Sequence, residues 1–471
     1  MAVAFTSALD LSRALRAKEL SAGEVMQATL DRIEAVNGAV NAVVSLRARE
    51  ALLAEAKAAD GQDSKGWLHG IPVAVKDLAN ATGVPTSMGS PVFAGQMADR
   101  DDLHIARMRA AGAIVIGKTN TPEFGLGSHT FNPVFGATTN PYDTSKTCGG
   151  SSGGAAVALA TGISAVADGS DMMGSLRNPA AWNNVYGIRP SVGVVPSEPK
   201  GDTYLMHLAT NGPMARNPSD LAALLDTMAG PDARQPFHLD IGATLPRIDA
   251  DVAGRKIGWL SDWGGAVPFE PGILELCEDA LRQMGELGLQ VEALKPPCSA
   301  EALWEPWQGL RHYAIACGLG PLIENPTTKD RLKETARWEI ENGLALSGAD
   351  VHRLSSLRSA WFQTAAKLFQ TYDVLALPTT QVWPFALDLE YPTEIAGTKM
   401  DTYHRWMEVV LPASLIGLPV VSVPVGFGAN GLPMGMQLIG RQGADAQVLQ
   451  VAQAWHRATD WPNARPPQIQ S

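Results

Sequence analysis

The N-terminal part of the chain places its apolar residues at helical spacing. Ser21 and Glu24 have the spacing of a capping box, and they precede an apolar repeat that includes Val25 and Ile33. Such a repeat is typical of an amphipathic helix that buries one face. The pattern therefore predicts a helical N-terminal segment over residues 1–60, in which the helices begin near residue 7.

Short apolar runs bounded by Gly and Pro replace this pattern beyond residue 65. The runs at residues 71–75, 113–116 and 163–167 predict strands that are buried on both faces, as in a sheet covered by helices. Between them, residues 101–111 have helical spacing. Because strand and helix alternate, the chain is predicted to have an α/β layer fold.

The pattern changes again in the second half of the chain. Residues 230–371 are richer in helical patterns, which predicts a helix-rich cover. Strand patterns return at residues 374–377 and 420–425, and a turn at residues 429–431 leads into a further strand at 434–439. The sheet is therefore expected to take strands from both ends of the chain.

Together these patterns predict one domain over residues 1–471, with a mixed, twisted β-sheet covered by helices on both faces. Its expected parts are the helical N-terminal segment, a core at residues 65–229, a more variable cover at 230–371 and C-terminal strands at 372–471. No internal repeat or low-complexity linker divides the sequence, which favours one domain over two.

The composition is that of a globular protein, and its charge argues against a nucleic-acid partner. With 45% hydrophobic and 18% charged residues the chain can bury a large core, and its net charge of -11 repels a phosphate backbone, so nucleic acid is not expected as a partner.

Features of the sequence also bear on where the protein is found. The four cysteines form no CxxC pair, which predicts a reducing compartment. No signal peptide is visible, and the apolar stretch at residues 155–167 is shorter than the roughly 20 residues that cross a bilayer. We expect a cytoplasmic protein with no membrane partner.

Three pattern matches are given no functional weight. Residues 112–119 match a phosphate-binding loop, but their apolar middle predicts a strand. Residues 149–153 match a nucleophile elbow, but residues 143–148 before them are polar turn formers rather than a strand. Acidic residues near His104 are better explained by the start of a helix than by a metal site, so neither a metal nor a cofactor is expected.

Candidate chemistry lies in three short stretches: GIPVAVKD with Lys76, CGGSSGGAA with Ser151, and SDMMGSLRNPAA with Ser175. A serine hydroxyl attacks a carbonyl only when a base removes its proton, and glycine-rich loops leave backbone N–H groups free to bind an oxyanion. Burial at the end of an apolar run would lower the pKa of Lys76 towards values at which its amine accepts a proton. The alternatives are a salt bridge from Lys76 to Asp77 or Asp171 and a loop at Ser151 that only caps a helix.

Taken together, these stretches resemble the amidase signature family. The similar segments are residues 70–90, 117–140 and 149–191, with a weaker match at 411–440. The resemblance implies the amidase signature fold and amide hydrolysis by a Ser-Ser-Lys triad.

The resemblance also assigns roles to individual residues. Lys76 is the implied base, Ser151 the bridging serine with a cis peptide bond, and Ser175 the nucleophile that forms an acyl-enzyme. It further implies an oxyanion hole of backbone N–H groups from Met172, Met173, Gly174 and Ser175. Ser152, Asp171 and Arg177 are the implied supports of this site.

One departure from the family concerns the loop before Ser175. Where the family most often has Asp-Thr-Gly-Gly-Ser, this chain reads DMMGS, with two large thioether side chains at Met172 and Met173. We expect these two, with Trp182 and Phe131, to form an apolar wall that favours apolar or aryl amides, anilides or carbamates. The alternative is that these side chains are simply core.

Two other functions share the signature. A glutaminase subunit of a tRNA-dependent amidotransferase would work in a complex that delivers ammonia. A catalytically silent binding protein would keep the fold without the chemistry. The sequence leaves the natural substrate and the oligomeric state open, a homodimer included.

Overall fold

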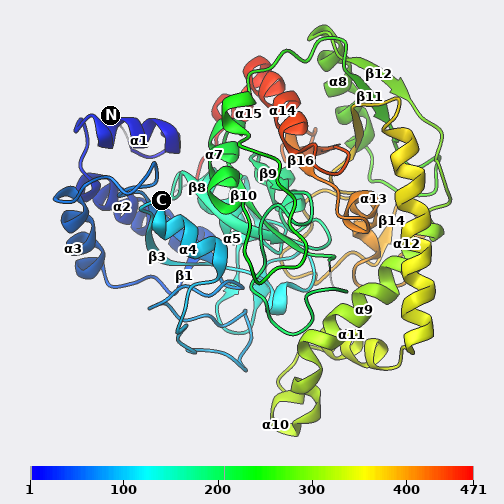
Figure 1. The fold of residues 1–471 in the computed structure, drawn as a ribbon, viewed down its shortest axis with the longest axis horizontal. Coiled ribbons are helices and arrows are strands. Elements are labelled where there is room, and N and C mark those ends of the chain that lie inside the picture. The colour runs from blue at the N-terminus through cyan, green and yellow to red at the C-terminus, as the bar shows by residue number, and fades with distance from the viewer. Residues whose placement is uncertain (1–2, 206, 470–471) are drawn as a thin grey trace.

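The centre of the computed structural model, which describes residues 3–205 and 207–469, is a mixed eight-stranded β-sheet (Figure 1). Its middle strands are buried on both faces because their sequences are apolar runs. Strands β12, β11 and β13 are parallel to one another, and all other neighbours in this sheet are antiparallel. In spatial order the strands are β12 (Gln290–Ala293), β11 (Lys256–Trp259), β13 (Val374–Pro378), β17 (Pro433–Ile439), β16 (Val420–Phe427), β9 (Tyr186–Arg189), β10 (Thr210–Ala215) and β8 (Val166–Asp171).

A second sheet of three strands lies beside β8. It consists of β1 (Val43–Val44), β3 (Ile114–Thr119) and β2 (Pro72–Lys76) in that spatial order. Strand β2 packs against β8, and the Lys76 N–H donates to Asp168 Oδ1 at 3.0 Å. This contact joins the two sheets at the end of β2.

Short strands among the described residues also form separate two-stranded sheets. They are β4 (Phe131–Asn132) with β5 (Gly136–Ala137), β6 (Thr139–Asn140) with β7 (Asp143–Thr147), and β14 (Glu394–Ile395) with β15 (Thr398–Lys399). The strand β7 corrects the prediction of a turn at residues 143–148. Its side chains are polar because it is part of a two-stranded hairpin with exposed positions and not of the buried sheet.

Helices surround both sheets, and one of them, α5, packs against strands of both. All residues of α5 are buried. The helices are α1 (Ala8–Arg16), α2 (Ala22–Val40), α3 (Arg49–Asp60), α4 (Leu103–Ala110), α5 (Gly153–Ala160), α6 (Arg177–Trp182), α7 (Pro218–Met228), α8 (Ile273–Glu286), α9 (Glu301–Glu324), α10 (Pro326–Lys329), α11 (Glu334–Leu344), α12 (Gly348–Leu368), α13 (Leu411–Ser414), α14 (Asp445–Thr459) and α15 (Trp461–Ala464).

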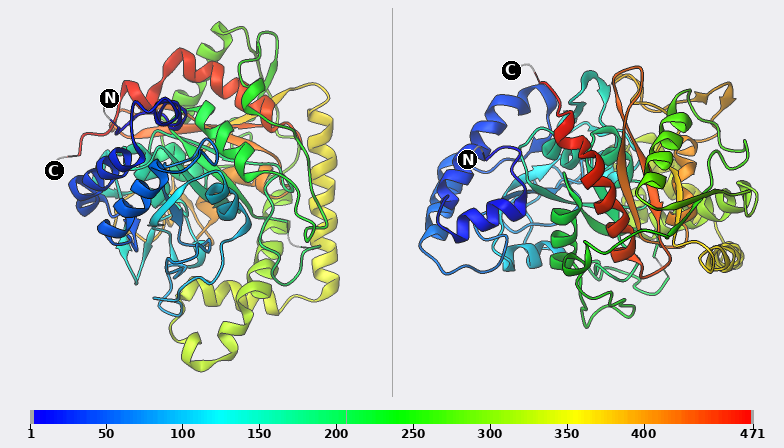
Figure 2. Two further views of the ribbon diagram at one scale, coloured as in Figure 1. Left: turned by 60° about the vertical axis from the view of Figure 1, so that its left-hand side comes forward. Right: turned by 90° about the horizontal axis from the view of Figure 1, so that it is seen from above.

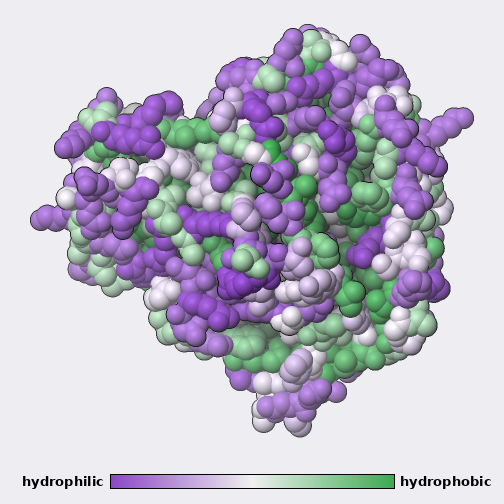
Figure 3. All heavy atoms as spheres, viewed as in Figure 1, coloured by the Kyte–Doolittle hydropathy of each residue, from purple (hydrophilic) through white to green (hydrophobic). Residues whose placement is uncertain are grey.

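The helical segments occupy opposite ends of the molecule. Helices α1 to α3 form one end, and α9, α11 and α12 pack together at the other (Figure 1). Both marked ends of the chain lie on the side of α1 to α3 in the two views of Figure 2, where Ile469 packs against the N-terminal apolar cluster. Hydrophobic residues gather around α9 and α11 on the face shown in Figure 3. No described helix is long and apolar enough to span a membrane.

The α/β class with a large mixed sheet and the predicted strand segments are confirmed, with two differences in detail. The strand predicted at residues 163–167 begins later, as β8, because the turn after α5 takes up residues 161–165. The helix-rich middle of the chain also contributes strands β11 and β12, which the sequence analysis did not predict.

The packing of α5 generates a prediction about stability. A Cβ at Gly154 would collide with the backbone of Asn120 and Ala42, whereas a Cβ at the exposed Gly38 in α2 would meet nothing within 4 Å. We expect Gly154→Ala to lower the free energy of unfolding by about 1–3 kcal/mol or more, because backbone atoms must move. Gly38→Ala is the control and should raise it by up to about 1 kcal/mol. Urea unfolding of both variants measures this; equal effects would contradict the packing described.

Candidate active site

The amine of Lys76 is the central group of the site. Lys76 ends β2, its side chain is buried, and its Nζ lies 2.8 Å from Ser151 Oγ and 2.8 Å from Ser152 Oγ. A third hydroxyl, that of Ser170 in β8, lies 3.1 Å away. The sequence places these residues far apart, and the contact between β2, β8 and α5 brings them together.

Burial shifts the protonation of this amine. Removal from water lowers the pKa of Lys76 to about 7, although the charges of Asp168 and Asp171 act in the opposite direction. A substantial fraction of the amine is therefore neutral near pH 7 and able to accept a proton. Within the described residues Lys76 forms no ion pair with Asp77, which binds Ser87, or with Asp171, so the alternative of a structural salt bridge is not realised.

Ser151 lies on the loop between β7 and α5, and the peptide bond that precedes it is cis. Two hydroxyl groups from residues 128–130 hold this loop in place. Ser128 Oγ donates to Gly150 O at 2.6 Å, and Thr130 Oγ1 donates to Gly149 O at 2.7 Å. The loop is therefore fixed by side chains of residues 128–130. The N-cap residue Ser152 makes no capping hydrogen bond to α5 through its side chain, which instead contacts Lys76.

Ser175 lies on a second loop that follows β8. The Ser152 N–H donates to Ser175 O at 3.1 Å, which ties the two serine loops together. Ser175 and Ser151 line the same cavity. No hydrogen bond joins their two hydroxyls within the described residues, so the hydroxyl-to-hydroxyl contact of a relay is not formed in this structure; such contacts often tighten only when substrate binds.

Asp171 holds the shape of this second loop. Its carboxylate accepts hydrogen bonds from the Gly174 N–H at 2.9 Å and the Leu176 N–H at 3.1 Å, and from two N–H groups of Arg177, each at 2.9 Å. Burial by itself would raise the pKa of Asp171, but the charges of Arg177 and Arg189 outweigh this and hold it well below its usual range. The carboxylate stays ionised and keeps all its donors.

Arg177 connects the loop to the C-terminal third of the chain. Its Nη1 donates to Gln437 Oε1 of β17 at 2.5 Å, and its Nη2 donates to Ser414 Oγ of α13 at 2.5 Å. The guanidinium is fully buried. The loop that carries Ser175 is thus fastened to the large sheet.

The structure corrects one member of the expected oxyanion hole. The N–H of Gly174 is occupied by Asp171, which leaves the N–H groups of Met172, Met173 and Ser175 as candidates. Gly174 has a φ of 84°, and a Cβ there would collide with Asn178, so glycine is required at this position. Met173 does not have a positive φ, so its side chain is compatible with the loop.

The serines face a cavity of about 310 Å³. Ser151, Ser170 and Ser175 form its polar wall, and most of the other lining side chains are apolar. A further wall comes from α9, which contributes Arg311 and Ile315 among others. The large apolar lining residues are Leu78, Met88, Phe124, Leu126, Met172, Met173, Ile315, Leu319 and Met407.

Two of the expected cavity residues lie elsewhere. Trp182 is fully buried, stacks on Trp406 with ring centres 5.8 Å apart and donates to Thr380 Oγ1 at 3.1 Å. Phe131 packs on His129, with ring centres 4.7 Å apart. Neither lines the cavity of Ser175, because Trp182 ends a buried helix and packs into the core. Of the four side chains expected to form the apolar wall, Met172 and Met173 line the cavity, whereas Trp182 and Phe131 do not.

Sequence reasoning also missed residues that line the cavity. Ser170 directly precedes Asp171, so the motif itself could have indicated it. Arg311 could not be found in this way, because nothing in the helical pattern of residues 301–324 shows which face of α9 meets the serines.

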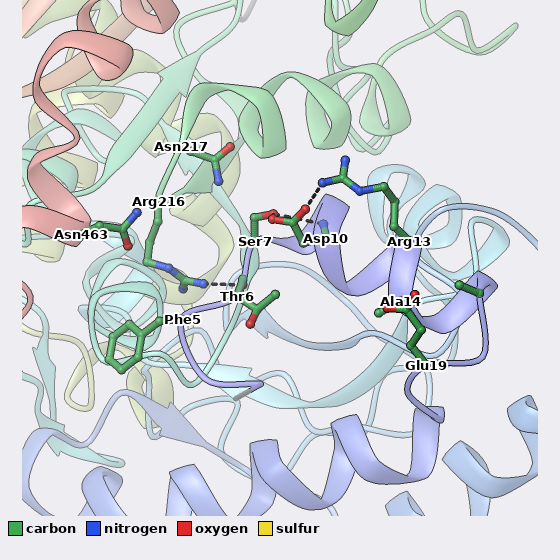
Figure 4. A pocket seen from close by; sticks show the side chains of 11 residues that line it. Phe5, Thr6, Ser7, Asp10, Arg13, Ala14, Glu19, Arg216, Asn217 and Asn463 are labelled. Carbon is green, nitrogen blue, oxygen red and sulfur yellow. Dashed lines mark hydrogen bonds and ion pairs between the residues drawn. The ribbon is translucent and has the colours of Figure 1, made fainter. Parts of the chain in front are cut away.

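A larger hollow of about 610 Å³ lies at the N-terminal end of the molecule, between α1 and α7 (Figure 4). Three of its charged side chains, those of Arg216, Asp10 and Arg13, form internal bonds. Arg216 donates to the carbonyl of Thr6 at 2.8 Å and to those of Leu159 and Ser164, and Asp10 pairs with Arg13. No described group of three or more His, Cys, Asp and Glu side chains is arranged to hold a metal ion.

Comparison with known proteins agrees with this geometry. The family model described as Amidase matches residues 24–449. An acylamidase of Rhodococcus erythropolis is 31% identical over 98% of this chain and 97% of its own length. One subunit of the glutamyl-tRNA(Gln) amidotransferase of Symbiobacterium thermophilum is 33% identical over 98% of each chain.

Solved structures also share this fold. A bacterial aryl acylamidase of the amidase signature family superposes with a TM-score of 0.91 at 29% identity, covering 98% of this chain and 99% of that one. A 6-aminohexanoate cyclic dimer hydrolase superposes with a TM-score of 0.88 at 27% identity, covering 98% of each chain.

The fold and its relatives define the protein as an amide-hydrolysing enzyme. The chain belongs to the Amidase family, also called the amidase signature family, over nearly its whole length.

The buried amine predicts how the site responds to pH. Because the pKa of Lys76 is lowered to about 7, the amine is protonated below that pH and accepts no proton. We expect the rate at which a sulfonyl fluoride labels Ser175 to rise about tenfold per pH unit below 7 and to level off above it. Mass spectrometry of the labelled peptide measures this. A rate that keeps rising to pH 10 would show that Lys76 has its ordinary pKa.

Proposed function

We propose that the protein hydrolyses apolar or aryl amides, anilides or carbamates through an acyl-enzyme on Ser175. The observation that carries this proposal is the buried Lys76 amine, 2.8 Å from the Ser151 hydroxyl, with Ser151 and Ser175 on one cavity wall. A desolvated amine with a pKa near 7 has the strength that general base catalysis requires at neutral pH.

In this mechanism neutral Lys76 takes the proton of Ser151, and Ser151 takes that of Ser175 as the Ser175 oxygen attacks the amide carbon. The developing oxyanion is stabilised by N–H groups of the loop at Met172, Met173 and Ser175, which Asp171 holds in place. The proton returns through Ser151 to the leaving nitrogen as the C–N bond breaks. The same relay then takes a proton from a water molecule, which attacks the acyl carbon. The bond to Ser175 breaks, its oxygen takes up the proton, and the acid is released.

The cavity supports the substrate class. Met88, Met172, Met173 and Met407 line it, and thioethers make favourable contacts with aromatic rings and adapt to irregular shapes. Similarity to an acylamidase and to an aryl acylamidase supports the same class. A small aliphatic amide would leave most of the 310 Å³ without a partner.

The second candidate function is glutamine hydrolysis within an amidotransferase complex, which similarity to the Symbiobacterium thermophilum protein favours. The cavity argues against it. Free glutamine carries an ammonium and a carboxylate, and the described lining residues include a single charged side chain, Arg311, which Glu339 already balances. A silent binding protein would have no need of a buried amine beside three hydroxyls.

The mechanism predicts the effect of removing each reacting group. Ser175→Ala should lower kcat on an acyl anilide by ~10⁴-fold or more, and Lys76→Ala by ~10²-fold or more, because the nucleophile and its base are lost. Ser164→Ala is a matched control: Ser164 is also buried, and its hydroxyl has no partner among the described residues. It should keep wild-type kcat. Near-normal turnover by Lys76→Ala with the fold intact, checked by circular dichroism, would refute the base.

Substrate size provides a separate test. We expect kcat/KM for an acyl anilide to exceed that for acetamide or propionamide by at least ~30-fold, because burial of an aromatic ring adds about 2–3 kcal/mol. Glutamine should be hydrolysed more slowly than the anilide by the purified chain alone. A preference for the small amides or for glutamine would overturn the proposed substrate class.

A further inference from the structure

One charged side chain lines the substrate cavity together with the serines. Arg311 of α9 is 3% exposed and is the single charged residue among the described residues that line this cavity. The polar groups of Ser151, Ser170 and Ser175 all belong to the catalytic wall. A buried cation in an otherwise apolar wall requires an explanation, since it is costly unless its N–H groups are satisfied.

Most of the guanidinium is held in a rigid frame. Its Nε donates to Glu339 Oε1 at 2.7 Å, and its Nη2 donates to the hydroxyl of Tyr403 at 2.7 Å. Tyr403 in turn donates to Glu339 Oε1 at 2.5 Å, and His312 Nδ1 lies 2.6 Å from Glu339 Oε2. Burial opposes the charge, but Glu339 outweighs it and raises the pKa of Arg311, so the side chain is a fixed cation.

The remaining nitrogen of the guanidinium, Nη1, has no oxygen acceptor among the described residues. Its partner among the described residues is the Sδ of Met172, at 3.3 Å. A thioether is a weak acceptor, and Nη1 carries two N–H groups. Met172 also lines the cavity, so this strong donor lies at the cavity wall with a poor partner.

The charge around Arg311 limits what Nη1 can bind. Glu339 balances Arg311, and the next cation, Lys333, donates to Leu126 O at 2.6 Å with Glu123 close by. The group therefore offers no excess positive charge. A substrate carboxylate would meet the field of Glu339 in a poorly solvated cavity, whereas an uncharged carbonyl would gain a charge-assisted hydrogen bond without that repulsion.

We propose that Arg311 is a specificity-determining residue that binds, through Nη1, a second uncharged carbonyl of the substrate, remote from the amide that is cleaved. This inference rests on the proposed function and narrows it to amides or carbamates that carry another carbonyl, such as a ketone or a further amide, on an apolar body. The substrate carbonyl takes the place of the Met172 sulfur as acceptor, and the flexible thioether moves aside.

The test compares pairs of anilides that differ only by C=O against CH₂, with the carbonyl on the acyl part in one pair and on the amine part in the other. A hydrogen bond to a charged donor corresponds to ~10-fold or more in kcat/KM. We expect the carbonyl compound of at least one pair to be preferred by that factor in the wild type. In Arg311→Lys, which keeps a cation beside Glu339 but removes the guanidinium fork, the ratio should fall below ~3.

A matched control is Arg353→Lys, which changes an exposed arginine of α12 that pairs with Glu305 at 2.6 Å, far from the lining residues in sequence. Its ratio should equal that of the wild type. A third compound with a carboxylate at the carbonyl position should be cleaved less well than the ketone. Wild-type ratios within threefold in both pairs, an unchanged ratio in Arg311→Lys, or a preference for the carboxylate would each overturn the proposal.

The kcat/KM ratio of the wild type tests the proposal even if Arg311→Lys does not fold. Measurement of substrate binding tests the role of Arg311 separately from the proposed function. Calorimetry with Ser175→Ala measures the Kd ratio of each pair without turnover. Absence of anilide hydrolysis by the wild type would refute the proposed function, whereas equal Kd values of the carbonyl and methylene compounds would refute the role of Arg311. A structural role for Arg311 alone would change stability and leave both ratios unaltered.

Discussion

The structure depends on keeping the Lys76 amine away from water and close to hydroxyl groups. Desolvation lowers its pKa to about 7, and this requires that β2, β8 and α5 meet without a gap. The three hydroxyls of Ser151, Ser152 and Ser170 satisfy the amine without forcing it to be charged, as a carboxylate partner would. The Ala- and Gly-rich sequence of α5 fits this close packing, because a Cβ at Gly154 would collide with the backbone of Asn120 and Ala42.

A second constraint is the shape of the loop before Ser175. Asp171 takes up the N–H groups of Gly174 and Leu176, and Arg177 links the same carboxylate to β17 and α13. Segments that are far apart in the sequence thereby hold the loop that carries Ser175, the proposed nucleophile. In the proposed mechanism, different parts of the chain supply the chemistry and the specificity. The signature segments carry the proposed reacting groups, and α9 supplies a further wall of the cavity.

The sequence was sufficient for the strands whose apolar runs are buried on both faces, and for Lys76, Ser151 and Ser175 as candidates, because these lie in short motifs of unusual composition. It failed where three-dimensional packing decides. Nothing in the motif shows that Trp182 packs into the core although it lies close to Ser175 in sequence, or that the Gly174 N–H is taken by Asp171. The polar strand β7 was predicted as a turn because hairpin pairing, not burial, stabilises it.

Direct titration of Lys76 tests the central claim. The protein is labelled with ¹⁵N at its lysine side chains, and the Lys76 resonance is assigned by its loss in Lys76→Ala. This resonance should titrate with a midpoint near pH 7, as the buried amine requires. A midpoint near the ordinary lysine value of about 10.4 would contradict the account, because a permanently charged amine accepts no proton from Ser151.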